Sequence, residues 1–171
     1  MKALFIIAQE GYQDLEYGVP KQILEKAGIE VVTASKKAGI CIGGLGGRAT
    51  ATISIDEVDV ADYAAIVFIG GPGAVRYQHD VEAHLTAQEA ITEGKVLAAI
   101  CIAPTILAYA GVLEGKKATV WNNDGNQQKI LQKEGATFTG EKVTIDGKII
   151  TANGPAAAEE FGKSILKMLK K

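Results

Sequence analysis

The sequence predicts a doubly wound α/β domain, in which helices cover both faces of a mostly parallel sheet. Two observations support this prediction. Strand-like apolar runs alternate with segments of helix-like apolar spacing along all 171 residues. The chain also contains 20 glycines, most of them at the ends of these segments, where tight turns between strand and helix are expected.

The first half of the chain begins with a predicted buried strand. Residues 3–8 are a continuous apolar run, and residues 13–27 follow with the spacing of an amphipathic helix that ends before Gly28. The further elements expected here are strands at 29–34, 49–55 and 64–69, and a helix at roughly 81–93 with Val81, Leu85 and Ile91 as its apolar positions.

The second half continues the alternation. A strand ends at Cys101, a short helix runs to Tyr109, and 118–121 is expected to be another strand. A helix around Ile130, a hairpin over 143–150 with an Asp-Gly turn, and a last helix opened by Asn153-Gly154-Pro155 complete the pattern. Because no linker, repeat or low-complexity tract interrupts it, residues 1–171 are predicted to form a single domain.

Composition narrows the classes of function. The net charge is −2 without a basic stripe, which argues against a nucleic-acid partner, and the apolar runs are too short to span a membrane. Cys41 and Cys101 cannot build a disulfide framework, which suits a reducing cytosol and predicts a cytoplasmic protein. The spacing of cysteines and histidines suggests no metal site, and no glycine pattern matches a phosphate loop. No cofactor is therefore predicted.

The segment around Cys101 is the strongest candidate for chemistry. An apolar strand stops at this cysteine, and the Pro104 helix begins just after it, so the sequence predicts a nucleophile elbow with the thiol at the bend. The nearby helix N-terminus is expected to favour the thiolate over the thiol. The alternative is an ordinary buried cysteine that packs as a small hydrophobic residue.

Two other loops are expected at the same edge of the sheet. The backbone of Gly70 and Gly71, with the amide of Ile102, is a candidate oxyanion hole, although a simple tight turn also explains the glycines. Asp14 and Glu16 follow the first strand and are candidates to exchange a proton with the thiol. Each also has a plain structural role, Asp14 as a helix N-cap and Glu16 in the favourable first turn.

Four motifs occur in order along the chain: Asp14-Leu-Glu16, Gly70-Gly71, the Cys101-x-x-Pro104 elbow, and Gly111-Val-Leu-x-Gly115. Together they resemble the ThiJ/PfpI family, which includes the parkinsonism-associated deglycase and archaeal intracellular proteases. The similarity covers nearly the whole chain. It implies a flavodoxin-like sandwich of the class I glutamine-amidotransferase type and a homodimer or higher homo-oligomer.

The resemblance also implies roles for individual residues. Cys101 matches the nucleophile, and Glu16 matches a protonated carboxyl group that hydrogen-bonds its sulfur. Gly70, Gly71 and Ile102 match the backbone around that sulfur. Trp121 and Pro155 fall in the expected substrate pocket, although a core packing role for Trp121 stays open.

One departure from the family pattern concerns the base. Protease members carry a histidine directly after the cysteine, where this chain has Ile102. Isoleucine cannot exchange a proton, so a Cys-His peptidase would lack its base at that position. The resemblance, taken with this departure, therefore implies a cofactor-independent enzyme that acts on small reactive carbonyl compounds, of the glyoxalase or deglycase type. A thiol sensor of oxidative stress and an intracellular peptidase remain the alternatives.

Overall fold

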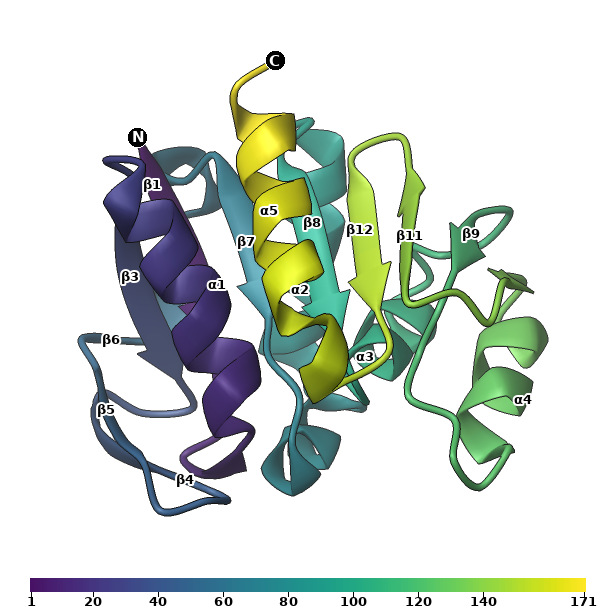
Figure 1. Ribbon diagram of the computed structural model, residues 1–171, viewed down its shortest axis with the longest axis horizontal. Coiled ribbons are helices and arrows are strands. Elements are labelled where there is room, and N and C mark those ends of the chain that lie inside the picture. Colours follow the sequence, from purple (N-terminus) through teal and green to yellow (C-terminus); the bar gives the residue numbers. More distant parts are fainter.

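A seven-stranded sheet forms the centre of the protein (Figure 1). The computed structural model describes residues 1–171. The strands lie in the order β11-β12-β8-β7-β1-β3-β6, and all neighbouring pairs are parallel except β11 with β12. The bounds are β1 (Lys2–Ile6), β3 (Glu30–Ser35), β6 (Ile53–Ser54), β7 (Ala65–Phe68), β8 (Val96–Ile100), β11 (Val143–Asp146) and β12 (Ile149–Ala152).

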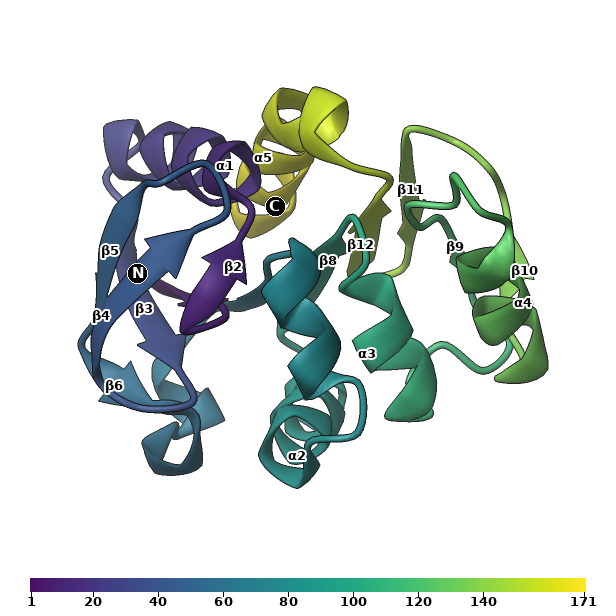
Figure 2. The same cartoon turned by 90° about the horizontal axis from the view of Figure 1, so that it is seen from below.

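Helices cover both faces of this sheet, which confirms the predicted fold class. Figure 2 shows α1 (Asp14–Lys26) and α5 (Ala158–Leu169) on one face and α2 (Val81–Thr92) and α3 (Pro104–Tyr109) on the other. Strands β7 and β8 are buried at every position, as expected for a parallel sheet that is covered on both sides. None of the helices has the length and apolarity needed to cross a bilayer.

The order of the five long parallel strands fixes where a site can form. These strands lie side by side as β3-β1-β7-β8-β12, which is the order 2-1-3-4-5 when they are numbered along the chain. The connections therefore run in opposite directions from β1, and a crevice opens at the carboxyl ends of β1 and β7. The segments that leave β1, β7 and β8 therefore meet at one edge of the sheet. These segments carry Glu16, Gly70 and Cys101.

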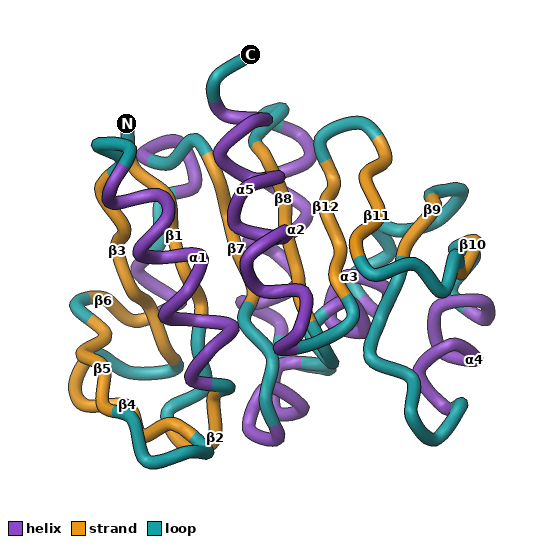
Figure 3. The backbone as a smooth tube through the Cα atoms, viewed as in Figure 1, coloured by secondary structure: helices purple, strands orange, loops and turns teal.

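A small second sheet lies beyond that edge and was not expected as such (Figure 3). It contains β2 (Glu10–Tyr12), β4 (Gly39–Gly43) and β5 (Arg48–Ala51). The predicted strand at 49–55 is divided, because the chain leaves β5 and joins the main sheet as β6. The alternating pattern of residues 49–55 indicates an extended chain, but it does not say with which sheet the chain pairs.

Helix α2 packs with a different face from the one predicted. Val81, Leu85 and Ile91 are 67%, 47% and 40% exposed, respectively. The buried positions are instead Ala83, Thr86, Ala87 and Ala90. These small residues let the helix backbone approach the sheet closely. This close packing stabilises the helix more than burial of the larger apolar side chains would.

The segment 118–121 is only partly a strand. Only Ala118 of this segment lies in a strand, β9 (Lys117–Ala118), which pairs with β10 (Thr137–Phe138) beside α4 (Asn126–Lys133) rather than with the main sheet. After β9 the backbone no longer forms strand-to-strand hydrogen bonds, because the Thr119 amide donates to the side-chain hydroxyl of Thr151 instead. Short 3-10 turns complete the fold: η1 (Ile55–Glu57), η2 (Val60–Asp62), η3 (Pro72–Tyr77) and η4 (Pro155–Ala157).

Candidate active site

Cys101 occupies a strained bend directly after β8. Its φ of 65° makes it the only residue other than glycine with a positive φ. The bend is held on both sides, because the Cys101 amide donates to the carbonyl of Ala152 (2.9 Å) and its own carbonyl accepts from the Trp121 amide (2.8 Å). A cysteine in this conformation is costly and persists only where the surroundings impose it, as in a nucleophile elbow.

Glu16 is fully buried beside this bend. Its Oε2 accepts a hydrogen bond from the Gly70 amide (3.1 Å), while its Oε1 has no hydrogen-bond partner. Gln13 fixes the backbone here, because its side chain caps α1 at the Glu16 amide (2.9 Å) and its own amide donates to the Gly70 carbonyl (2.9 Å). These hydrogen bonds therefore fix the first turn of α1 and the loop after β7 in position relative to each other.

Gly70 packs against both Glu16 and Cys101, whose side chains hydrogen-bond each other, and it cannot be replaced without displacing them. A Cβ atom at Gly70 would lie 2.6 Å from both the Cys101 Cβ and the Glu16 Oε2. Gly71 has a φ of 105°, and a Cβ there would collide with the Gly11 carbonyl. A simple tight turn does not require such close packing. Gly70 therefore serves the approach of this loop to the thiol, and Gly71 serves its approach to the loop after β1.

The backbone amides of Gly71 and Ile102 hydrogen-bond the Cys101 sulfur and act to lower its pKa. They belong to the loops after β7 and β8, and their convergence results from the pairing of these two strands. The structure thus brings together the residues that the sequence singled out around the thiol. Because both donors face the sulfur, they also adjoin the position where an oxygen anion would form on an attacked carbonyl.

The protonation of Cys101 differs from the prediction. Burial, and then the negative charge of Glu16, raise the pKa of the thiol to about 12, whereas a lowered pKa was expected. Two features explain the difference: the sulfur is largely removed from solvent, and α3 has only six residues, which makes a weak dipole. A free thiolate is therefore not favoured while Glu16 is ionised.

Burial raises the pKa of Glu16 to about 7, in the direction predicted. The hydrogen bonds of the carboxyl group with the Cys101 side chain and the Gly70 amide act in the opposite direction and only partly offset the effect of burial. Protonation of Glu16 removes its charge from beside the sulfur, which leaves the two backbone amides to stabilise a thiolate. Glu16 and Cys101 are thus a coupled pair in which the charge of one side chain controls the proton of the other.

A cavity of about 440 Å³ opens at Cys101. Trp121 and Pro155 line it, as do Gly71 and Ile102, so both predicted substrate-contact residues lie in its wall. Sequence reasoning missed four of the lining residues, which are Gln13, Pro72, Val75 and Gln127. Glu16 and Gly70 are not among the lining residues, but the carboxyl group of Glu16 hydrogen-bonds the side chain of Cys101 and so adjoins the reacting sulfur.

Asp14 does not have the role of N-cap that the sequence suggested. Gln13 caps α1, and Asp14 accepts hydrogen bonds from the amides of Leu45 (2.8 Å) and Gly47 (2.7 Å) instead. It thereby fixes the glycine-rich turn after β4. A proton exchange between Asp14 and the thiol has no support in this geometry.

The remaining cysteine and the histidines lie outside the site. Cys41 is buried in β4, where the Gln9 side chain donates to its sulfur (3.5 Å). His79 is exposed and its ring packs at a tilt against that of Tyr109, and His84 hydrogen-bonds the carbonyl of Gln78 (2.7 Å). No group of three or more His, Cys, Asp or Glu side chains is arranged to hold a metal ion.

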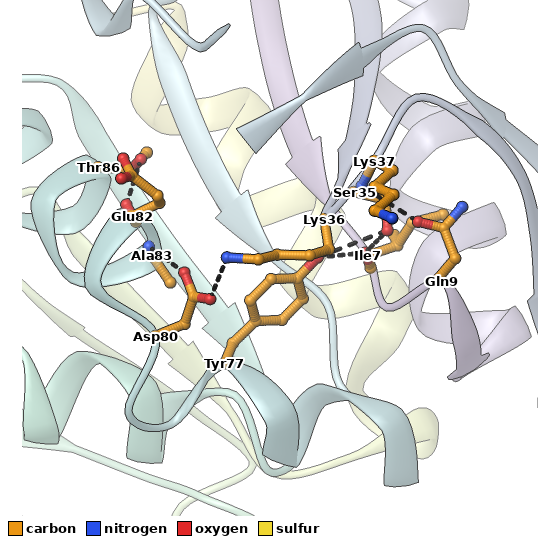
Figure 4. A network of polar contacts seen from close by, with 10 residues as sticks. All are labelled: Ile7, Gln9, Ser35, Lys36, Lys37, Tyr77, Asp80, Glu82, Ala83 and Thr86. Atoms are coloured by element: carbon orange, nitrogen blue, oxygen red, sulfur yellow. Dashed lines mark hydrogen bonds and ion pairs between the residues drawn. The ribbon is translucent and has the colours of Figure 1, made fainter. Parts of the chain in front are cut away.

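A second, smaller cavity of about 160 Å³ lies near the ends of β1 and β3. Figure 4 shows polar contacts of its lining residues: Lys36 pairs with Asp80, and Tyr77 donates to the carbonyl of Ile7. Gln9 likewise accepts from the Lys37 amide. These groups stabilise the loops after β1 and β3. The cavity at Cys101 is the candidate active site because it contains the strained thiol.

Comparison with known proteins agrees with this geometry. The family model described as DJ-1/PfpI family matches residues 1–168. The chain is 37% identical to an uncharacterized protein of Methanocaldococcus jannaschii, over 99% of this chain and 83% of that protein. It is 32% identical to Deglycase PfpI of Pyrococcus furiosus, over 99% of this chain and the full length of that protein.

Solved structures show the same arrangement. A ThiJ/PfpI domain protein from Brachyspira murdochii superimposes with a TM-score of 0.95 at 28% identity, covering 99% of this chain and 96% of the other. Drosophila melanogaster DJ-1beta gives a TM-score of 0.86 at 27% identity, covering 99% and 91%. The fold, the elbow and these matches over nearly the full length lead to one conclusion: the chain belongs to the DJ-1/PfpI family.

Proposed function

We propose that this protein is an enzyme in which Cys101 attacks small reactive carbonyl compounds, 2-oxoaldehydes such as methylglyoxal, and converts them to 2-hydroxy acids. The observation that carries the proposal is the strained thiol that opens into a cavity with a buried carboxyl group behind it. Relatives named deglycase support an activity of this kind.

In the first step the sulfur of Cys101 bonds to the aldehyde carbon. The carboxylate of Glu16 takes the proton of the thiol as attack proceeds, which offsets the raised pKa of that thiol. The carbonyl oxygen becomes an anion and is stabilised by the amides of Gly71 and Ile102. Glu16 then returns the proton to this oxygen, and a neutral hemithioacetal results.

In the second step Glu16 moves a proton between two carbon atoms of the substrate. It removes the hydrogen of the carbon bonded to sulfur and delivers a proton to the neighbouring ketone carbon, through an enediol. The first carbon is thereby oxidised to a thioester, and the second is reduced to an alcohol. Water hydrolyses the thioester and restores the thiol, so that one methylglyoxal and one water give one lactic acid. The oxidation and reduction are internal, and no external electron acceptor takes part.

The environment of Glu16 suits this repeated use. A group that accepts and returns protons is most effective when its pKa lies near the working pH. Burial raises the pKa of Glu16 to about 7, so both of its forms are populated near neutrality. An ordinary exposed glutamate would be almost entirely ionised there and would return the proton poorly.

The two alternatives receive less support. A peptidase needs a base that also protonates an amine leaving group, and Ile102 stands where protease members carry histidine. A thiol sensor needs an accessible thiolate, whereas burial raises the pKa of Cys101.

Formation of lactate from methylglyoxal tests the proposal. The Cys101→Ala variant should lose activity by at least about a hundredfold, because the covalent route requires the sulfur. Cys41→Ala is the matched control and should keep full activity, since Cys41 lies in the wall of neither cavity. Equal lactate formation by wild type and Cys101→Ala would contradict the proposal.

A further inference from the structure

Gln13 carries a hydrogen-bond donor that the protein holds in place but does not use. The side-chain oxygen of Gln13 is the N-cap of α1 and accepts from the Glu16 amide (2.9 Å). A backbone N–H group only donates, so the oxygen of the Gln13 amide must face the helix. The nitrogen, Nε2, is therefore the free end of the side chain. The backbone of Gln13 is fixed as well, because its amide donates to the Gly70 carbonyl (2.9 Å).

The Nε2 atom of Gln13 is accessible. It forms no hydrogen bond within the protein, in which the side chain of Gln13 takes part only as the acceptor of the helix cap. Two side-chain atoms of the protein are both buried and unpaired, and neither of them belongs to Gln13. The donor is thus open to a ligand, on a residue that lines the cavity at Cys101.

Gln13 lies beside the backbone that faces the thiol. A Cβ atom at Gly71 would be 2.5 Å from the Gln13 backbone nitrogen, and the Gly71 amide hydrogen-bonds the Cys101 sulfur. Most of the other side chains in the cavity wall are apolar, namely those of Pro72, Val75, Ile102, Trp121 and Pro155. In an apolar cavity a few placed polar groups fix the orientation of the ligand, and the donor of Gln13 is such a group.

We propose that Gln13 is a further catalytic residue, whose Nε2 donates a hydrogen bond to the ketone oxygen of the 2-oxoaldehyde. This rests on the proposed function, because it assigns a partner to the second oxygen of the same substrate. The amides of Gly71 and Ile102 serve the oxygen on the attacked carbon. The ketone oxygen is on the neighbouring carbon and takes a donor of its own.

The hydrogen bond from Gln13 strengthens during the second step. When Glu16 removes the hydrogen of the carbon bonded to sulfur, the electron pair of that C–H bond forms the double bond between the two carbons. The pair of the ketone bond moves onto its oxygen, which becomes negative, and a donor already in place stabilises that charge. Gln13 itself gives up no atom.

Alkylation of Cys101 by iodoacetamide and by iodomethane tests this inference without turnover. In iodoacetamide a carbonyl group is bonded to the carbon that sulfur attacks, as the ketone is in a 2-oxoaldehyde, whereas iodomethane has no oxygen. The ratio of the two rates therefore reports the donor, because a change in the proton of the thiol affects both reagents alike. Mass spectrometry of the Cys101 peptide measures both rates.

Two variants remove the donor and keep the helix cap. Gln13→Ser retains a capping oxygen without Nε2, and it should lower the ratio of iodoacetamide to iodomethane rates at least about threefold. Gln13→Glu keeps the size of the side chain and puts an acceptor where the donor was, so it should lower the ratio at least as much. Either variant decides the matter if the other does not fold.

Gln22→Ser is the matched control, since Gln22 is exposed on the same helix and does not line the cavity. This variant should keep the ratio of the wild type. The inference is overturned if the variants at position 13 keep the wild-type ratio, or if Gln22→Ser lowers it as much as they do.

The outcome is separable from that of the proposed function. If the proposed reaction takes place, Gln13→Ser should lower kcat for lactate formation at least about tenfold with little change in KM, because the hydrogen bond is strongest in the transition state. A protein that forms no lactate but shows the fall in the alkylation ratio would contradict the reaction and leave Gln13 as a donor to a carbonyl oxygen in the cavity. Lactate formation with an unchanged ratio would overturn the role of Gln13 alone.

Discussion

Replacing Glu16 by glutamine should make the protein more stable at alkaline pH. The change keeps the size of the side chain and an oxygen that can accept from the Gly70 amide, but it removes the ionisable group. Glu16 is fully buried, and one of its oxygens has no partner, so the folded protein opposes its ionisation. The unfolded chain, in which the group is hydrated, does not.

The magnitude follows from the two pKa values. The ordinary pKa of glutamate is 4.5, and burial raises that of Glu16 to about 7. With about 1.4 kcal/mol for each pKa unit, ionisation costs the folded protein about 3 kcal/mol more than the unfolded chain. Because the folded pKa is raised, this stability is fully present below pH 4.5 and is lost as the pH rises through 7.

Urea unfolding of both proteins at several pH values between 4 and 8 measures this effect. The free energies of unfolding should nearly coincide at pH 4, and Glu16→Gln should be more stable by about 3 kcal/mol at pH 8. The other ionisable groups are common to both proteins, so the difference isolates Glu16. A difference that does not change between pH 4 and 8 would refute the reasoning that burial opposes its charge.

Three further predictions concern Gly70, Asp14 and Cys41. Gly70→Ala should abolish alkylation of Cys101 and destabilise the fold, because the new Cβ would collide with the side chains of Cys101 and Glu16. Gly18 is exposed in a helix and a Cβ there meets no neighbour, so Gly18→Ala should instead stabilise the protein by about 0.5–1 kcal/mol. Urea unfolding of both variants measures these changes. Asp14→Ala should cost about 2 kcal/mol and speed hydrogen exchange at the Gly47 amide, whose acceptor is lost; unchanged exchange would contradict this. Under native conditions iodoacetamide should leave the buried Cys41 unmodified, and mass spectrometry of the peptide that contains it checks this.

The fold and much of the site could be predicted because they depend on local patterns. A buried strand that ends in cysteine and then meets a helix places the thiol at the carboxyl edge of the sheet wherever the strand lies. Glu16 and Gly70 follow strands that lie next to each other in this topology, so their meeting followed from the alternation of elements.

Other features depend on three-dimensional context that no local pattern carries. Asp14 is a better N-cap than Gln13 by propensity, but the distant turn at Gly47 uses its carboxylate. Gln127 lies in a polar stretch that predicts an exposed surface, and only the packing of α4 against the cavity buries it. The raised pKa of Cys101 likewise reflects burial in the folded protein, whereas the sequence showed only the nearby helix N-terminus.

The coupling of Cys101 to Glu16 is tested most directly by the pH dependence of the rate at which iodoacetamide alkylates Cys101, in wild type and in Glu16→Gln. In wild type the rate should rise as the coupled pair loses its first proton, with a midpoint near pH 7, because the Glu16 carboxylate can then accept the proton of Cys101 during attack. In Glu16→Gln the rate at pH 7 should fall by at least about tenfold and rise only toward the pKa of the buried thiol, which stays above its ordinary value of 9. Identical pH profiles in the two proteins would show that the carboxyl group does not control the thiol.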